Sequence, residues 1–88
     1  MGLGNTLYSS LTFKQGQPEQ SNFGDYLVAR IDATPETHVH VIQSEAPPGG
    51  VGEPGVPPVS AAICNAIFNA VGRRIRALPV DPAELKAA

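Results

Sequence analysis

The chain has 88 residues, a formal net charge of −2 and a single cysteine. This length suits one small domain with a modest hydrophobic core, and it is short for an enzyme that must enclose a substrate. The near-neutral charge provides no electrostatic footprint for nucleic acid, and one cysteine excludes an internal disulfide or a cysteine zinc cluster. Because no stretch approaches the roughly 20 apolar residues of a membrane span, we expect no transmembrane helix.

The N-terminal third of the chain predicts short elements. Residues 1–11 favour a helix only weakly, because glycines and an asparagine interrupt its leucines. Residues 11–14 alternate between apolar and polar and then meet a Gln-Gly pair, which predicts a short strand and a turn. Residues 17–26 are predicted to form a loop, since Pro18 cannot donate a hydrogen bond to a strand ladder. Residues 26–32 favour an extended segment, with a short helix as the open alternative.

Polar and aromatic side chains mix in this loop, namely Asn22, Phe23, Asp25 and Tyr26. They are suited to line a pocket, but the default interpretation is a turn held by local hydrogen bonds. The residues by themselves assign no chemical role to this loop.

Residues 37–44, THVHVIQS, form the strongest predicted strand. Its side chains alternate between two faces: one face has Val39, Val41 and Gln43, and the other has His38, His40 and Ile42. This period of two is typical of a strand. The two histidines share one face, but no third ligand of suitable type is evident in the sequence, so we expect no metal site.

The loop PPGGVGEPGVPP, residues 47–58, contains nine Pro or Gly residues among twelve positions and one ionisable group, Glu53. Pro54 disfavours the helical conformation at Glu53, and Gly52 and Gly55 permit close approach of a neighbour or unusual backbone conformations. The loop therefore presents Glu53 between a predicted strand and a predicted helix, a usual position for a catalytic group. An enclosed pocket would suit such a carboxylate for proton transfer. The alternative is a solvated loop carboxylate.

Residues 58–72 form the clearest predicted helix, with prolines at its start, Gly72 just past its end and two arginines beyond. The helix is apolar nearly all round, so it calls for burial on several sides, and the rest of the chain is too short to provide that burial. Cys64 lies in this apolar run, which favours a buried, inert thiol. A final helical turn is predicted with Asp81 as N-cap and Pro82 as its first residue. The predicted fold class is α+β, with short strands and one principal helix in the C-terminal half.

Two stretches carry a specific resemblance: SNFGDYLVARI, residues 21–31, and the run from VHVIQSEAPP to RRIRALPV, residues 39–80. Together they resemble the C-terminal end of the molybdenum-binding subunit of the xanthine dehydrogenase/aldehyde oxidase family. Within that family they are similar to the isoquinoline 1-oxidoreductase β-subunit type of bacterial aldehyde and N-heterocycle oxidoreductases. The resemblance predicts that residues 1–80 are a piece of a larger molybdopterin-binding domain and that residues 81–88 are a tail.

The resemblance implies a role for the Gly-Glu-Pro loop. In the family, the glutamate that matches Glu53 is the catalytic base of a hydroxylation, and Gly50, Val51 and Gly52 match the loop near the pterin. The implied cofactor of the complete enzyme is molybdopterin of the cytosine dinucleotide type, and the chain alone is expected to bind none. The implied partners are the remainder of the molybdenum-binding subunit and an iron–sulfur subunit, because the chain lacks segments for the main cofactor site.

Two hypotheses from different classes follow. In the first, the chain is part of a molybdenum hydroxylase and supplies Glu53, while the isolated 88 residues are inactive. In the second, the chain is a non-catalytic interaction module that binds a partner through its apolar helix. The substrate, the electron acceptor and the cellular compartment are left open by the sequence.

Overall fold

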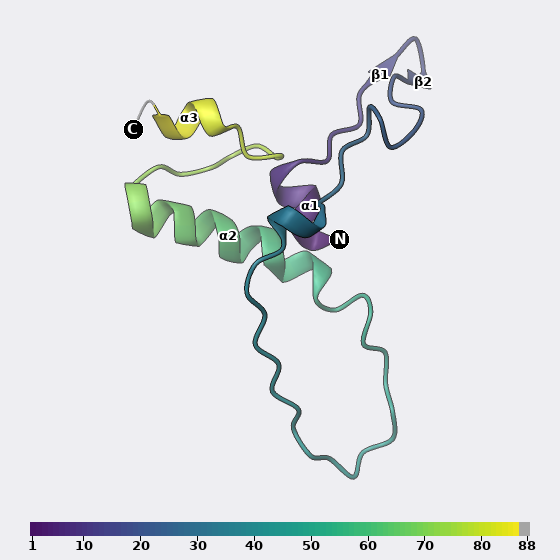
Figure 1. Ribbon diagram of the computed structural model, residues 1–88, viewed down its shortest axis with the longest axis vertical. Coiled ribbons are helices and arrows are strands. Elements are labelled where there is room, and N and C mark those ends of the chain that lie inside the picture. Colours follow the sequence, from purple (N-terminus) through teal and green to yellow (C-terminus); the bar gives the residue numbers. More distant parts are fainter. Residues whose placement is uncertain (87–88) are drawn as a thin grey trace.

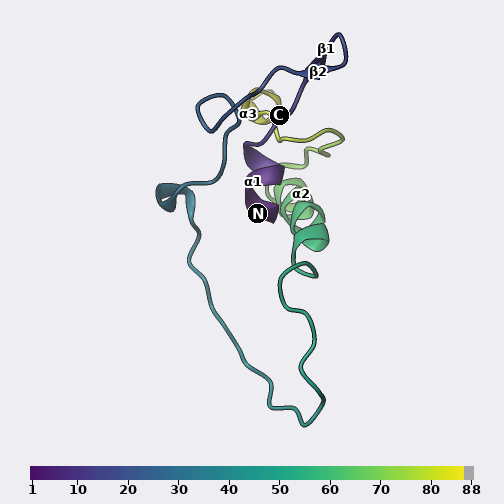
Figure 2. The ribbon, with the colours of Figure 1, turned by 90° about the vertical axis from the view of Figure 1, so that its right-hand side faces the viewer.

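The computed structural model describes residues 1–86, so the last two residues of the predicted 81–88 tail lie outside the described part. The elements in chain order are α1 (Gly2–Leu7), β1 (Phe13–Lys14), β2 (Gln17–Pro18), the 3-10 helix η1 (Ile31–Ala33), α2 (Val56–Val71) and α3 (Pro82–Lys86). Figure 1 shows α1 lying against α2, with the hairpin of β1 and β2 reaching away on one side and residues 34–55 forming a long open loop on the other. Figure 2 shows the same open loop from the side.

The hairpin confirms the predicted strand and turn near residue 14. Strands β1 and β2 pair antiparallel, and the two turn residues, Gln15 and Gly16, have φ angles of 51° and 77°, as the tight hairpin turn requires. Pro18 was predicted to lie in a loop but pairs opposite Phe13. In this pairing the missing Pro18 N–H would point away from β1, because the bonded pairs are the neighbouring ones in the ladder.

Small residues bring α1 and α2 together, and we call this contact the α1–α2 seam (Gly2, Thr6, Val59 and Ser60). A Cβ atom on Gly2 would lie 3.0 Å from the Cβ of Val59, so glycine permits the close approach. Thr6 is fully buried; its Oγ1 donates to the Gly2 carbonyl (2.8 Å) and shares a 2.7 Å hydrogen bond with Ser60 Oγ. The Val80 N–H donates to the Thr6 carbonyl (2.8 Å), which ties the C-terminal segment to the seam.

The predicted principal helix is confirmed as α2, which begins two residues earlier than expected, at Val56. Its end is set by Gly72, which has a left-handed φ of 71° and whose N–H donates to the Phe68 carbonyl (2.8 Å). Beyond this cap, the Arg74 guanidinium lies 3.7 Å from the centre of the Phe68 ring and donates to Asn65 Oδ1 (3.1 Å). The predicted cap of the last helix is confirmed as well, since the Ala83 N–H donates to the Asp81 carboxylate (2.8 Å).

Only one face of α2 is partly covered. The half-buried residues follow helical spacing: Val56, Val59, Ser60, Ile63, Cys64 and Ile67. The alanines of the opposite face are exposed, and Phe68 and Val71 retain 41% and 49% of their accessible surface. The chain therefore does not provide the burial on several sides that the apolar sequence of this helix calls for.

The accessible surface shows how little of the chain is packed. It amounts to 7482 Å², whereas a compact monomer of this mass exposes about 4,900 Å². The radius of gyration is 16.4 Å, against about 12 Å for a compact domain of this length. The buried hydrophobic side chains within residues 1–86 are Ile75 and Val80. This hydrophobic core is small for a chain of 88 residues.

The predicted strand at residues 37–44 does not form. This stretch is irregular and exposed, and it lies in the open loop away from the helices. A strand needs a neighbour for its main-chain hydrogen bonds, and β1 and β2 already pair with each other in the two-stranded sheet. The prediction was wrong for this chain because no other segment among the described residues lies beside the stretch. Within residues 1–86 no helix is both long enough and apolar enough to cross a bilayer.

Candidate functional site

Glu53 lies at the end of the open loop, immediately before the turn into α2, as the sequence predicted. The Glu53 carbonyl accepts a hydrogen bond from the Val56 N–H (3.0 Å), which forms this turn. The prolines at the start of α2 have no N–H, so this helix start needs no side-chain cap, and none is present at Gly55. The exposed Glu53 carboxylate makes neither an ion pair nor a capping hydrogen bond within residues 1–86, so it is free to face a partner.

The three residues predicted to lie near a cofactor, Gly50, Val51 and Gly52, directly precede Glu53 in the open loop. Val51 is 96% exposed, and a Cβ atom built on Gly50 or Gly52 meets nothing within 4 Å in the described chain. Gly52 and Gly55 were expected to permit unusual backbone conformations, but neither has a φ angle in the left-handed region. Without a Cβ atom, glycines at these exposed positions allow an atom from outside the chain to approach the backbone closely.

The two histidines of the predicted strand do not form a metal site among residues 1–86, where no group of three potential ligands comes together. His38 Nε2 instead lies 3.2 Å from the Glu36 carboxylate in an exposed pair. An exposed pair of this kind contributes little to stability. The structure thus places both histidines in the exposed open loop.

The loop after the hairpin is a locally hydrogen-bonded turn, as its default interpretation predicted. The Asp25 carboxylate accepts from the backbone N–H groups of Asn22 (2.9 Å) and Ser21 (3.0 Å), and Asn22 Oδ1 accepts from the Gly24 N–H (2.7 Å). The hydrogen bond from the Asn22 N–H is the main reason why the pKa of the Asp25 carboxyl lies below its usual value of 3.8, and the hydrogen bond from the Ser21 N–H lowers this pKa further. Asp25 is thus the residue that holds this turn together.

This arrangement predicts an acid transition confined to the turn. A lowered pKa in the folded chain means that the Asp25 contribution is fully present above the usual value and is lost as pH falls through the lowered pKa. Carboxyl and amide NMR titration should show the Ser21 and Asn22 amide signals moving together with the Asp25 carboxyl signal, below pH 3.8. In Asp25→Asn those amide signals should no longer move in that pH range. If the Ser21 and Asn22 amide signals of the parent chain do not shift while the Asp25 carboxyl titrates, this assignment is contradicted.

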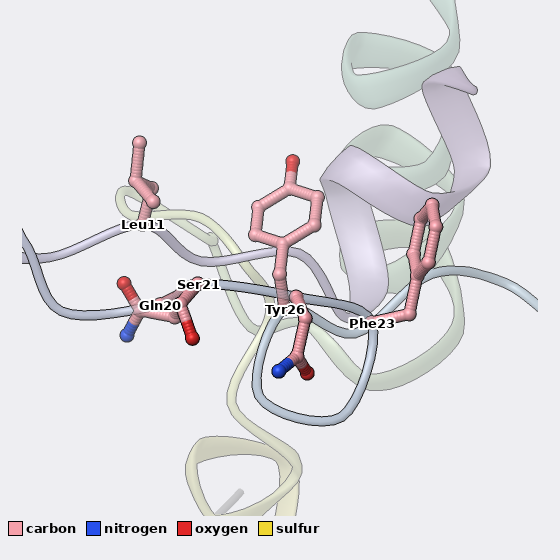
Figure 3. A pocket seen from close by; sticks show the side chains of 6 residues that line it. Leu11, Gln20, Ser21, Phe23 and Tyr26 are labelled. Atoms are coloured by element: carbon pink, nitrogen blue, oxygen red, sulfur yellow. The ribbon is translucent and has the colours of Figure 1, made fainter.

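The same turn borders a shallow, mainly apolar concavity lined by Leu11, Gln20, Ser21, Asn22, Phe23 and Tyr26. Figure 3 shows the side chains of Leu11, Phe23 and Tyr26 rising on the same side of the loop. The sequence singled out three of the lining residues, Asn22, Phe23 and Tyr26. It missed Ser21 and the two residues that flank the hairpin, Leu11 and Gln20. Gln20 is already bonded to Thr12 through both ends of its amide, so the concavity offers few free polar groups. It does not adjoin Glu53.

Cys64 is a free thiol, half-buried on α2. It borders a second shallow groove, together with Ser60 and the segment from Ile75 to Leu78. Cys64 was predicted to be buried, whereas within the described chain it is only half-buried, because one face of α2 alone is partly covered.

Comparisons with known proteins identify what this chain is similar to. No family model matches it. Over 96% of its length it is 43% identical to the membrane-bound aldehyde dehydrogenase (pyrroloquinoline-quinone) of Gluconacetobacter polyoxogenes, of which it spans 11%. It is 33% identical over 93% of its length to isoquinoline 1-oxidoreductase subunit beta of Brevundimonas diminuta, of which it spans 10%. Over 97% of its length it is 32% identical to a probable xanthine dehydrogenase protein of Bacillus subtilis, of which it spans 12%.

The chain therefore spans about a tenth of the length of these curated relatives, while the relatives match nearly all of the chain. The matched part includes the open loop and α2, because the alignments leave out few residues of the chain. Nearly the whole chain is thus homologous to a segment of bacterial aldehyde dehydrogenase, isoquinoline 1-oxidoreductase and xanthine dehydrogenase proteins, as the sequence resemblance predicted.

Proposed function

We propose that this chain supplies one side of the active site of a molybdenum hydroxylase that oxidises an aldehyde or an N-heterocycle, with Glu53 as the general base. The observation that carries the proposal is the uncommitted Glu53 carboxylate, which follows three small or apolar exposed residues and precedes the fixed start of α2. The homology to oxidoreductase proteins supports the reaction class. The remainder of the molybdenum-binding subunit and an iron–sulfur subunit are the proposed partners.

A carboxylate in this position is suited to accept a proton. It has no partner in the described chain that would have to be displaced first, and the turn at Val56 fixes the backbone next to it. Enclosure by a partner would exclude water and align the carboxylate with the group that loses its proton. In this role Glu53 binds and removes the proton, while Gly50 and Gly52 allow the backbone to lie close to the cofactor.

The described residues fit molybdopterin as one wall of a site. The backbone at Gly50 and Gly52 is open to close approach, which a Cβ atom would hinder, and no set of three potential metal ligands is present within residues 1–86. The remaining contacts to the cofactor are therefore assigned to the part of the enzyme that this chain does not span. When bound, the cofactor supplies the redox chemistry of the hydroxylation. We assign it the cytosine dinucleotide form from the resemblance to the family.

A second cofactor has to be tested, because the name of the Gluconacetobacter relative includes pyrroloquinoline quinone. The decisive experiment purifies the assembled enzyme from its own cells through an affinity tag on this chain and measures metal and organic cofactors. We expect molybdenum close to one per enzyme subunit and a pterin released as its cytosine dinucleotide. The 88-residue chain expressed alone is expected to contain neither and to oxidise no aldehyde or N-heterocycle. Enzyme that contains pyrroloquinoline quinone and no molybdenum would overturn the cofactor assignment.

The non-catalytic interaction module is the second candidate, and the exposed outer face of α2 favours it. Both candidates require a partner, because the chain exposes far more surface than a compact domain of its mass. They differ at Glu53, which is essential for turnover in the first case and dispensable in the second. The substitution Glu53→Gln separates them.

A further inference from the structure

We infer that residues 37–43 of the open loop add as a β-strand to a sheet in the remainder of the enzyme subunit, and that this pairing holds one end of the loop that carries Glu53. The inference rests on the proposed function for the identity of its partner. Its evidence comes from a conflict between sequence and structure at one segment. The side chains alternate as in a strand, yet the chain provides no neighbouring strand.

The main chain of this segment is open to a partner. Residues 37–43 are all exposed, and their main-chain N–H and C=O groups make no hydrogen bond with another main-chain group within residues 1–86. The local hydrogen bonds lie at the margins: Thr37 Oγ1 donates to the Pro35 carbonyl, and the Ala46 N–H donates to Ser44 Oγ. A segment with free donors and acceptors and alternating side chains is the type of segment that joins the edge of a sheet.

The segment also exposes apolar side chains that a partner could bury. Val39 and Val41 are 77% and 79% exposed and share one face of the predicted strand, whereas Ile42 on the other face is 88% exposed. β-branched residues of this kind are enriched in strands, where they pack against neighbours on the pleated surface. If the segment joined a sheet, Val39 and Val41 would pack into the hydrophobic core on one face of that sheet. His38, His40 and Ile42 would lie on the opposite face.

The amount of exposed surface favours a large permanent partner over a transient one. The chain exposes about 2,500 Å² more than a compact monomer of its mass. Permanent interfaces bury about 2,000–5,000 Å² summed over both partners, or about 1,000–2,500 Å² on each, so the surplus on this chain matches the upper end of that range. The matched segment is only about a tenth of the length of the relatives. Under the proposed function, the other nine tenths are the natural source of a receiving sheet.

The consequence concerns Glu53. The open loop is fixed at the turn into α2, where the Val56 N–H donates to the Glu53 carbonyl, and at η1, where the Thr34 N–H donates to the Ile31 carbonyl (3.3 Å). Between these two points no hydrogen bond joins the main chain of residues 35–52 to another main-chain group within residues 1–86. Pairing of residues 37–43 would add a fixed point about ten residues before Glu53, much nearer than the one at Thr34, so the unfixed stretch of the loop becomes shorter. A loop fixed at both ends loses much of its conformational freedom, so it can hold a carboxylate in one position. Residues 37–43 thus act as a positioning strand for the loop and make no contact with the reacting atoms.

Amide hydrogen exchange tests the inference. The probe is a chimera in which this chain replaces the homologous segment of the Gluconacetobacter aldehyde dehydrogenase, compared with the isolated 88-residue chain. We expect the amides of residues 37–43 to exchange freely in the isolated chain and to slow at least about tenfold in the chimera, at alternate or at all positions. Free exchange at these amides in a folded chimera whose α2 amides are protected would overturn the inference. If the chimera does not fold, exchange at the aligned residues of the unaltered relative decides the question in the same way.

A proline substitution gives an independent test. Val39→Pro removes one donor within the pairing segment, whereas Glu45→Pro makes the same change at an exposed loop position outside it. We expect Val39→Pro to lower the yield of assembled chimera severalfold and to restore fast exchange at residues 37–43, while Glu45→Pro does neither. Equal behaviour of the two variants would contradict strand addition. This result is distinguishable from failure of the proposed function, which is judged by turnover per bound cofactor in Glu53→Gln, a variant that leaves the strand intact.

Discussion

Glu53→Gln in the assembled enzyme is expected to lower turnover per bound molybdenum by at least about 10²–10⁴-fold, the range that general base catalysis commonly contributes. Glutamine keeps the size of the side chain and part of its hydrogen bonding, but it cannot accept the proton. Because the Glu53 side chain caps no helix and forms no ion pair within the described residues, its substitution should leave folding and cofactor content unchanged. The loss should therefore appear in the chemical step.

The control for this substitution is Glu45→Gln, which removes the same charge at another exposed position of the same loop. We expect Glu45→Gln to retain the turnover of the parent enzyme. A purely structural role of Glu53 would give the opposite pattern, namely lower molybdenum content with near-normal turnover of the loaded fraction. Glu53→Gln within a few-fold of the parent enzyme, per bound molybdenum, would remove Glu53 from the mechanism and favour the interaction module.

Gly2→Leu is expected to produce the largest structural effect, because it fills the α1–α2 seam. A Cβ atom at Gly2 already comes within 3.0 Å of Val59 Cβ and 3.2 Å of the Val56 carbonyl, so a leucine forces α1 away from α2. Separation of the helices would also strain the hydrogen bond between Thr6 and Ser60. Overpacking of this kind costs about 1–3 kcal/mol, and loss of the partner of a buried hydroxyl adds about 1–3 kcal/mol.

The measurement is the urea concentration at which the chimera loses half of its turnover, together with the yield of soluble, cofactor-loaded protein. The matched control is Gly49→Leu, where the same change meets nothing within 4 Å among the described residues. We expect a clear fall in midpoint and yield for Gly2→Leu and little change for Gly49→Leu. Equal midpoints for the two variants would show that the α1–α2 seam does not form in the assembled protein.

The elements that the sequence predicted correctly are those whose signals are local. Prolines at the start of α2 and Gly72 at its end act through backbone geometry within one turn, so the helix could be located without knowledge of its surroundings. The same holds for the cap at Asp81 and for the hairpin turn at Gln15 and Gly16. Glu53 was placed in the irregular loop for an equally local reason, since Pro54 disfavours a helical conformation before it.

The elements that depend on distant neighbours were predicted less well. The alternation in residues 37–43 specifies a strand only where another strand is available, and the described chain offers none beside them. The α1–α2 seam was missed because glycine was weighed only as a residue that disfavours helices. The spacing of two small residues, Gly2 and Thr6, four positions apart on one helix face was the signal that could have revealed it. Ser60 of α2 is the partner that completes the contact.

The most direct test of the central claim is the position of Glu53 in a cryo-EM structure of the assembled enzyme with a substrate analogue bound. We expect the open loop to close against the rest of the subunit and the Glu53 carboxylate to lie about 2.6–3.2 Å, or one water molecule, from the group that loses its proton. A carboxylate that points into bulk solvent, on a loop that remains as open as in the chain alone, would contradict the claim that this chain supplies the catalytic base.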